Sequence, residues 1–376
     1  MLSKRAIARQ EHVSRNFVMA WTKSPDQDLS FDARGWKKHQ LRHYTLPDEQ
    51  RILKIHQQLD KDSTVYFSGA SAILQEYQKQ YPNGKTITLR FIGRTLAKHG
   101  LSTKPKVRVK GASKYLHYPA TLIDKLGGSI LELDFIGKKF IDNRTEPVNF
   151  IGFSLTKPRK LKYFQRVESE TAAEAIIHCE RFFDTFEKPE VVKVDNGFAF
   201  ASAGPQARTL NSFTLFLLKK KIIPVFTAPR KPWNQASIEG SNSIFSRKFW
   251  HRERYTSIEM IDQRLTWFNK SYQQYHGYKA PSRGTRRKEP FVPMVYFIRK
   301  VYQDEQTKRA YIEILKEKII LPKSYTAMFM LVQWNLQHDT LCVLYESDQQ
   351  AIIVKELNFK LNPKTKEVSG SLSLVT

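Results

Sequence analysis

Apolar positions in the first hundred residues recur at the spacing of helices. In residues 1–43, Ala8, Val13, Val18 and Trp21 predict two short helices joined by a tight turn. Residues 44–101 predict a second, winged-helix-like unit, made of the three amphipathic segments LPDEQRILKIHQQL, SGASAILQEYQKQYP and TITLRFIGRTLAKHG. The pattern then changes to alternating strands and helices from residue 118, and to short alternating strands after residue 310. We therefore expect a multidomain chain that is all-α at the front, α/β in the middle and all-β at the end.

Residues 118–290 predict an α/β domain with five strands. The expected elements are strands at 129–136, 148–156 and 161–167, a helix at 171–187, a strand at 190–194, a helix at 208–220, a strand at 222–227 and helices from about residue 235 and at 257–278. The first three strands would form an antiparallel meander, and the later two would add in parallel. This mixed five-stranded sheet has the element order of a ribonuclease-H-like fold. Residues 291–376 predict a linker helix and a small β-barrel, from four or five short strands within about 50 residues.

Charge is distributed unevenly along the chain. The 376 residues include 62 Lys and Arg against 36 Asp and Glu, a formal net charge of +26, and half of that excess lies within residues 1–115. Residues 102–117 predict a basic linker able to follow a phosphate backbone. The balance favours nucleic acid as partner, with a generic basic protein or a membrane-surface binder as alternatives.

Cysteine content and hydropathy exclude several classes of protein. Cys179 and Cys342 are the only cysteines, too few for a disulfide framework or a cysteine-rich zinc module. The N-terminus has no apolar signal segment, and no apolar run approaches the roughly 18 residues of a membrane span. We expect a cytoplasmic protein without a membrane partner.

The second short helix is a candidate for reading DNA. Ser14 can cap it through its hydroxyl, and Arg15 and Asn16 would then project from its first turn. This is helix-turn-helix spacing, in which the start of the second helix meets base edges in the major groove. An ordinary helical hairpin is the alternative, because His12 stands at the turn where Gly is usual.

The third amphipathic helix of residues 44–101 carries a basic stripe. Leu89, Ile92 and Leu96 fall on one face, and a second face presents basic residues at four-residue spacing. The basic residues are Arg90, Arg94 and Lys98. They predict a DNA-facing surface, with a solvated helix face as the alternative.

One predicted strand places a carboxylate within an apolar run. In SILELDFIG, Leu131 and Leu133 face one way, whereas Glu132 and Asp134 face the other. An ionised carboxylate buried there is costly unless it is paired or bound. We expect Asp134 to face a ligand site and Glu132 to be its neighbour rather than a ligand.

Two further acids complete a candidate metal site. Asp195 follows the buried strand of VVKVDNG, where open α/β sheets place ligands, and Glu239 lies in the first turns of the helix after APRKPWNQ. In the predicted sheet order, Asp134, Asp195 and Glu239 converge. Their repulsion would become a binding site for Mg²⁺ or Mn²⁺, and two ions roughly 4 Å apart could clamp an in-line phosphoryl displacement. Each acid alone would more often be a solvated turn residue or an ion-pair partner.

These motifs resemble the DDE transposases and integrases with a ribonuclease-H-like core, most closely bacterial insertion-sequence transposases. The matching segments are LELDFIG at Asp134, VDNG at Asp195 and KPWNQASIEGSN at Glu239, in which Pro232 and Gln235 occupy the positions usual in the family. The resemblance extends from the helix-turn-helix spacing through the helix FNKSYQQYHGYKAP to the terminal β segment.

The sequence departs from the family pattern in two places. The gap of 43 residues between Asp195 and Glu239 is longer than is common, and Ser246 stands where a basic residue is frequent, with Arg247 and Lys248 after it. The resemblance implies that Gln235, Arg247 and Lys248 contact DNA.

The resemblance implies a transposase. Its expected reaction cleaves phosphodiester bonds at the ends of a mobile element and joins the 3′-OH ends to target DNA by two-metal transesterification. Asp134 would bridge two Mg²⁺ or Mn²⁺ ions, which Asp195 and Glu239 complete. The expected partners are double-stranded DNA and further copies of the chain, at least a dimer on DNA in the bacterial nucleoid, and the sequence does not specify whether an accessory ATPase takes part. Alternatives are a nuclease of the same fold that does not join DNA, and a domesticated or regulatory DNA-binding protein.

Overall fold

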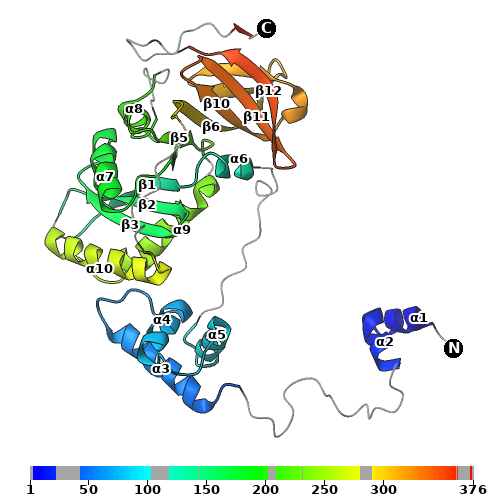
Figure 1. Ribbon diagram of the computed structural model, residues 1–376, viewed down its shortest axis with the longest axis vertical. Coiled ribbons are helices and arrows are strands. Elements are labelled where there is room, and N and C mark those ends of the chain that lie inside the picture. The colour runs from blue at the N-terminus through cyan, green and yellow to red at the C-terminus, as the bar shows by residue number, and fades with distance from the viewer. Residues whose placement is uncertain are drawn as a thin grey trace. The chain divides into compact units, whose positions relative to one another are not determined.

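The structure is a computed structural model that describes residues 3–22, 43–102, 118–142, 144–201, 209–230, 232–279, 290–360, 362 and 373–374 (Figure 1). Contacts divide the chain into two units, residues 1–53 and 54–376, and each is described by itself. The predicted basic linker lies almost wholly outside the described residues. None of the described helices is both long enough and apolar enough to cross a membrane.

Two short helices form the front of the first unit, as the sequence predicted. They are α1 (Lys4–Gln10) and α2 (Arg15–Thr22). Ala8 and Val18 are buried. The Ser14 hydroxyl accepts a hydrogen bond from the backbone N of Phe17 at 3.1 Å, which confirms the predicted cap. In the turn, His12 has φ of 52°, a left-handed conformation that costs a non-glycine residue energy.

All of the regular secondary structure in residues 43–102 is helical. The helices are α3 (Leu46–Lys61), α4 (Ala70–Gln80) and α5 (Leu89–Lys98). No strand occurs in this segment, so the wing of a winged helix is not present there. Ile92 and Leu96 are buried on α5. Leu89 was expected on the same face but is 48% exposed, because it is the first residue of the helix and lies at the edge of this core.

The segment between α3 and α4 is attached to a later helix, α10 (Ile258–His276). The backbone N of Tyr66 donates to the Ser271 hydroxyl at 3.1 Å, and the Tyr66 hydroxyl donates to the Arg264 carbonyl at 3.3 Å. The Phe67 ring stacks on Tyr275 with centroids 4.7 Å apart. These contacts anchor the helical segment within the second unit.

The five predicted core strands pair in the predicted order. They are β1 (Ile130–Lys139), β2 (Val148–Lys157), β3 (Leu161–Val167), β4 (Val191–Val194) and β5 (Ile223–Phe226). Strands β1, β2 and β3 form an antiparallel meander, β4 adds parallel to β1, and β5 adds parallel to β4. The order β3-β2-β1-β4-β5 places β1 in the centre, as expected for a ribonuclease-H-like core.

Helices cover both faces of these strands (Figure 1). They are α6 (Ala120–Asp124), α7 (Ala172–Thr185), α8 (Ser212–Lys219), η3 (Pro232–Gln235), α9 (Ala236–Ile244), the π-helical stretch η4 (Phe245–Trp250) and α10. Leu133 of β1 belongs to the buried cluster that contains Phe182 of α7, whereas Ile136 belongs to the cluster that contains Phe268 of α10. The alternation of β1 therefore sends Asp134 to the face that α9 and α10 cover.

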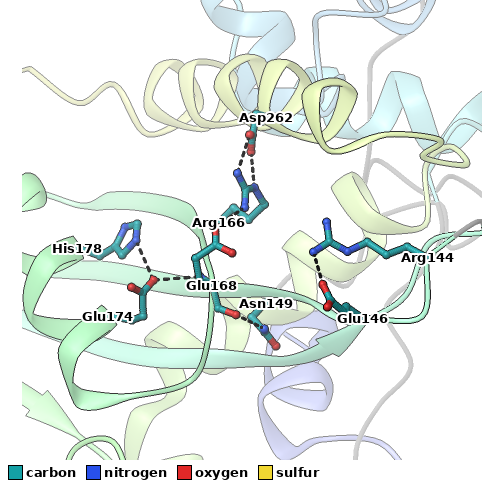
Figure 2. A network of polar contacts seen from close by, with 8 residues as sticks. All are labelled: Arg144, Glu146, Asn149, Arg166, Glu168, Glu174, His178 and Asp262. Atoms are coloured by element: carbon teal, nitrogen blue, oxygen red, sulfur yellow. Dashed lines mark hydrogen bonds and ion pairs between the residues drawn. The ribbon is translucent and has the colours of Figure 1, made fainter.

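A polar network joins the outer strand β3 to helices on both faces (Figure 2). Arg166 of β3 donates from Nε and Nη2 to the two carboxylate oxygens of Asp262 on α10, at 2.9 and 3.0 Å. On α7, Glu174 accepts from the backbone N of Glu168 at 2.9 Å and lies 3.5 Å from His178. The network fixes α7 and α10 relative to the same strand.

The C-terminal strands differ from the prediction. They are β6 (Met294–Lys300), β7 (Tyr302–Gln303), β8 (Ala310–Ile314), β9 (Glu317–Leu321), β10 (Phe329–Asn335), β11 (Thr340–Ser347), β12 (Gln350–Asn358) and β13 (Ser373–Leu374), with a short 3-10 turn, η5 (Lys323–Tyr325), before β10. The expected linker helix is not found, because residues 290–293 are irregular and β6 follows at once.

The small barrel is not confirmed as a separate body. β6 pairs in parallel with β5, and β10, β11, β12 and β13 continue outward, so that the core strands belong to one ten-stranded sheet. Strands β7, β8 and β9 form a second, three-stranded sheet. Buried residues of both sheets share one cluster with the α7 face of the core. Apolar packing against this cluster buries these strands.

Candidate active site

Asp134 lies in the middle of β1, beside α9. Its Oδ2 accepts a hydrogen bond from Nδ2 of Asn242 on α9 at 2.9 Å. The pKa of Asp134 is raised to about 8, first by burial and then by the nearby carboxylates of Asp195 and Glu239. The same three acids that the sequence singled out therefore lie close enough to repel one another.

Asp195 stands directly after β4, at the carboxyl end of that strand. Its Oδ1 accepts from the backbone N of Gly197 at 2.9 Å, a local bond that turns the chain away from the strand. Burial raises the pKa of Asp195, although the Gly197 bond opposes that shift.

Glu239 comes from the first turn of α9. Its side chain is more exposed than those of the two aspartates. The pKa of Glu239 is raised by partial burial, then by the charges of Asp195 and Glu132. The helix dipole favours a carboxylate in the first turn of α9. The raised pKa of Glu239 therefore comes from burial and from the neighbouring carboxylates of the site.

The three acids line one cavity of about 410 Å³, together with residues 227–230 after β5. Within the described part of the chain, no three His, Cys, Asp or Glu side chains are already arranged as ligands of one ion. The donor set nevertheless fits a divalent cation, because it consists of hard carboxylate oxygens. The pKa values of all three acids are raised, first by burial, and for Asp134 and Glu239 also by neighbouring carboxylates. The side chains would have to close around the ion.

Glu132, the other acid of β1, holds the start of α9 in place. Its Oε1 lies 3.1 Å from Nζ of Lys193 on β4, and both side chains are more than 90% buried. Its Oε2 accepts from the backbone N of Ile238 at 2.9 Å. Because Ile238 precedes Glu239, this one carboxylate ties the first turn of α9 to β1 and β4. The expectation that Glu132 is a neighbour rather than a ligand agrees with these contacts.

Gln235 makes an internal contact. Its side chain is only 4% exposed, and Nε2 donates to the carbonyl of Lys193 at 3.0 Å. The side chain thus joins η3 to β4, although it also lines the acidic cavity. Anchoring of the turn before α9 accounts for Gln235 without DNA, and the predicted DNA contact stays a prediction.

A C-terminal residue reaches the loop after Asp195. Arg299 of β6 donates from Nη2 to Oδ1 of Asn196 at 3.0 Å and from Nη1 to the carbonyl of Thr227 at 3.1 Å. Asn196 donates in turn to the same Thr227 carbonyl at 2.6 Å. Arg299 therefore holds together the ends of β4 and β5, which carry two walls of the cavity.

The other predicted DNA contacts lie on the surface. Ser14 uses its hydroxyl as the cap of α2. Seven residues are exposed on α2, α5 and η4, namely Arg15, Asn16, Arg90, Arg94, Lys98, Arg247 and Lys248. Their exposure makes each accessible, and contact with DNA stays a prediction.

Two residues gave no signal in the sequence analysis. Arg230, exposed with φ of 57°, lines the acidic cavity. Phe198, three residues after Asp195 in the chain, is 86% exposed and does not line that cavity. An aromatic residue directly after a DNG turn, and an Arg between the last core strand and α9, could have been singled out by their position alone.

No protein-family model matches the chain, and no curated protein matches it. Among solved structures, the chain is similar to a chain of the simian T-cell lymphotropic virus intasome in complex with PP2A regulatory subunit B56 gamma, at 14% identity over 81% of this chain and 96% of that one, with a TM-score of 0.33. It is also similar to the HTLV-2 integrase catalytic core domain in complex with magnesium, in its dimeric form, at 16% identity over 43% of this chain and 94% of that one, with a TM-score of 0.28. At likenesses this remote, the function has to be inferred from the residues of the site.

Proposed function

We propose that the protein is a DDE-type polynucleotidyl transferase, a transposase that cleaves DNA at the ends of a mobile element and joins the freed 3′-OH ends to target DNA. One observation carries the proposal: three carboxylates from β1, the end of β4 and the start of α9 line one cavity, and the pKa of each is raised. Such crowding is what a site for divalent cations and a phosphodiester requires.

Asp134, Asp195 and Glu239 would hold the Mg²⁺ or Mn²⁺ ions, two per site. Bound metal would activate the attacking oxygen and neutralise charge on the phosphate. The hydrogen bond from Asn242 orients the Asp134 carboxylate, and Glu132 fixes the helix that carries Glu239. Positioning of this kind is the main contribution of a protein to phosphoryl transfer.

The reaction forms no covalent bond to the protein. Water loses a proton and attacks the phosphorus in line, and the opposite P–O bond breaks to free a 3′-OH. That 3′-OH then attacks a target phosphodiester in the same way, so one bond forms for each that breaks. The net charge of +26 and the basic front helices suit the double-stranded DNA that both steps need. Synapsis of two ends requires at least a dimer, and the work would take place on the bacterial nucleoid.

A strand-transfer assay tests the proposal. Purified protein is mixed with the DNA that flanks its reading frame, supplied as labelled pre-cut ends, and with a supercoiled target, in Mg²⁺ or Mn²⁺. We expect joined products that disappear in EDTA. Asp134→Asn, Asp195→Asn and Glu239→Gln should each abolish joining while end binding persists.

Matched variants of exposed acids control for charge. Asp184→Asn on α7 and Glu170→Gln before α7 change exposed acids of the same core and should join ends like wild type. Joining by Asp134→Asn at a rate close to that of wild type in Mg²⁺ would refute the assignment of the site. Cleavage without any joining would instead identify a nuclease.

A further inference from the structure

A second cavity, of about 550 Å³, lies beside the acidic one. Here it is named the tyrosine cavity, and it is defined by Arg230, Arg299, Lys300, Tyr302, Tyr311 and Lys316. It shares Asn196, Pro229 and Arg230 with the acidic cavity. A strand whose phosphate lies at the acids could therefore continue into the tyrosine cavity. Its size falls in the range of roughly 300–1,000 Å³ typical of ligand sites.

Charge around the tyrosine cavity is opposite in sign to that of its neighbour. Four basic side chains line it, against one acid, Glu313. Arg299 is held by backbone carbonyls and by Asn196, which fixes one positive charge at the boundary between the two cavities. A polyanion drawn by this field would be brought to the carboxylates that hold the proposed metal ions.

Aromatic rings supply the second element of recognition. The rings of Tyr302 and Tyr311 lie 6.3 Å apart between centroids, and Tyr302 is 44% exposed. Deeper in the cavity, Phe226 and Phe297 stack at 5.3 Å and give it an apolar wall. An exposed ring beside basic side chains is the combination that binds bases of single-stranded nucleic acid without reading their sequence.

The rings also have cations near them. Nζ of Lys300 lies 5.9 Å from the centroid of Tyr302, and Nζ of Lys318 lies 4.8 Å from that of Tyr311. Each ammonium lies over one face of its ring, so a base would stack on the opposite face while its phosphate is bound by a basic side chain.

We propose that the tyrosine cavity binds one unpaired nucleotide of the DNA strand next to the reacting phosphodiester, its base against Tyr302 or Tyr311 and its phosphate near Lys300, Lys316 and Arg230. The proposal rests on the proposed function for its DNA substrate. It adds a base-binding site, contributed by β6, β7 and the β8–β9 hairpin, outside the three acids. A nucleotide held there is fixed in position relative to the reacting phosphate.

Photo-crosslinking tests where the base lies. A duplex with a short single-stranded 3′ extension carries 5-iodouracil at each position of the extension in turn, and binding takes place in EDTA so that no DNA is cut. We expect the crosslink to reach Tyr302 or Tyr311 from one or two adjacent positions only, as mapped by mass spectrometry. Crosslinks confined to other parts of the chain would overturn the proposal.

Affinity measurements separate stacking from charge. By fluorescence anisotropy, Tyr302→Ala should weaken binding of the extended duplex by roughly five- to a hundredfold, whereas Tyr302→Phe keeps the ring and should bind like wild type. Lys300→Ala and Lys316→Ala should each lower the salt slope of binding by about 0.7. Lys323→Ala, an exposed lysine of the same region that does not line the cavity, is the control and should change neither quantity. Unchanged affinity in both Tyr302→Ala and Tyr311→Ala would contradict the proposal.

Two further outcomes distinguish this proposal from the function it rests on. Crosslinks at Tyr302 without strand transfer in any metal would leave the DNA site standing and remove the transposase assignment. Strand transfer with crosslinks elsewhere would do the reverse. If a free mononucleotide binds wild type but not Tyr302→Ala, while oligonucleotide binding is unaffected, the cavity serves a small ligand and the proposed DNA contact is wrong.

Discussion

The buried pair of Glu132 and Lys193 offers the sharpest test of how the fold positions the site. Glu132→Gln keeps an oxygen for the backbone N of Ile238 but leaves the Lys193 ammonium buried without its anion. Breaking a buried pair in this way costs about 3–5 kcal/mol. Glu132→Leu also leaves the Ile238 N–H without its acceptor, which adds about 1–3 kcal/mol. Both side chains are more than 90% buried, so solvent screening does not reduce these magnitudes.

A double-mutant cycle isolates the pair. Lys193→Met alone should be as destabilising as Glu132→Gln, because it leaves the carboxylate uncompensated. The double variant Glu132→Gln/Lys193→Met carries neither charge and should recover most of the loss, giving a coupling energy of about 2 kcal/mol or more. Urea unfolding followed by tryptophan fluorescence measures the free energy of unfolding, and hydrogen exchange of the peptide containing Ile238 measures loosening of α9.

Activity gives a second reading of the same variants. Under conditions where the Glu132 variants are folded, strand cleavage should fall in parallel with the loss of protection at Ile238, because Glu239 follows it in α9. Additive effects, with a coupling energy below about 0.5 kcal/mol, would refute the idea that Glu132 and Lys193 act as one brace. Intact activity together with fast hydrogen exchange at Ile238 would show that the position of Glu239 does not depend on the hydrogen bond between Ile238 and Glu132.

Three other predictions concern separate parts of the molecule. Arg299→Ala removes the bonds to Asn196 and Thr227 and should lower the rate of strand transfer more than end binding, with Arg299→Lys intermediate; equal loss of both would contradict this. Burial lowers the pKa of Lys162 to about 8 in the folded protein, below its ordinary 10.5. Between pH 8 and pH 10.5 the unfolded chain therefore binds more protons than the folded protein. The free energy of unfolding should rise with pH across that window by up to about 3 kcal/mol and be lowest below pH 8. The urea midpoint of wild type should rise between pH 7 and pH 10, whereas the midpoint of Lys162→Met should not. An equal change of midpoint in the two proteins would disprove the prediction. His12→Gly removes a left-handed non-glycine residue and should stabilise the turn between α1 and α2 by about 1 kcal/mol, seen as slower hydrogen exchange in α2, whereas His12→Ala should not.

Local periodicity was sufficient to predict most helices, the five core strands and the orientation of Asp134. The alternation of Leu131, Leu133 and Asp134 reports the two faces of β1 directly, because side chains alternate along a strand. The candidate acids followed because parallel strands present their carboxyl ends at one edge.

Long-range pairing was beyond the reach of the same reasoning. A run of short alternating strands is compatible with a barrel and with an extended sheet, and it does not reveal that β6 pairs with β5 of the core. Glu132 illustrates the same limit at the site: its alternation gave its face, but the partner Lys193 and the backbone of Ile238 lie 61 and 106 positions away. Gln235 was expected to contact DNA, because the sequence does not show that this polar side chain is buried and hydrogen-bonded to the Lys193 carbonyl.

The continuity of the sheet across β5 and β6 has a practical consequence for dissecting this protein. A fragment that stops at residue 290, where a separable catalytic domain was expected to end, would leave the backbone N–H and C=O groups of β5 without the partner strand seen at Val225 and Phe226. Unpaired strand edges of this kind recruit other chains, and such a fragment should aggregate when expressed alone. It would also lack Arg299, and with it the clamp on the loop after Asp195. The smallest autonomous fragment that carries the three proposed catalytic acids should therefore extend through β12, so that β6, β10 and β11 are each paired on both sides.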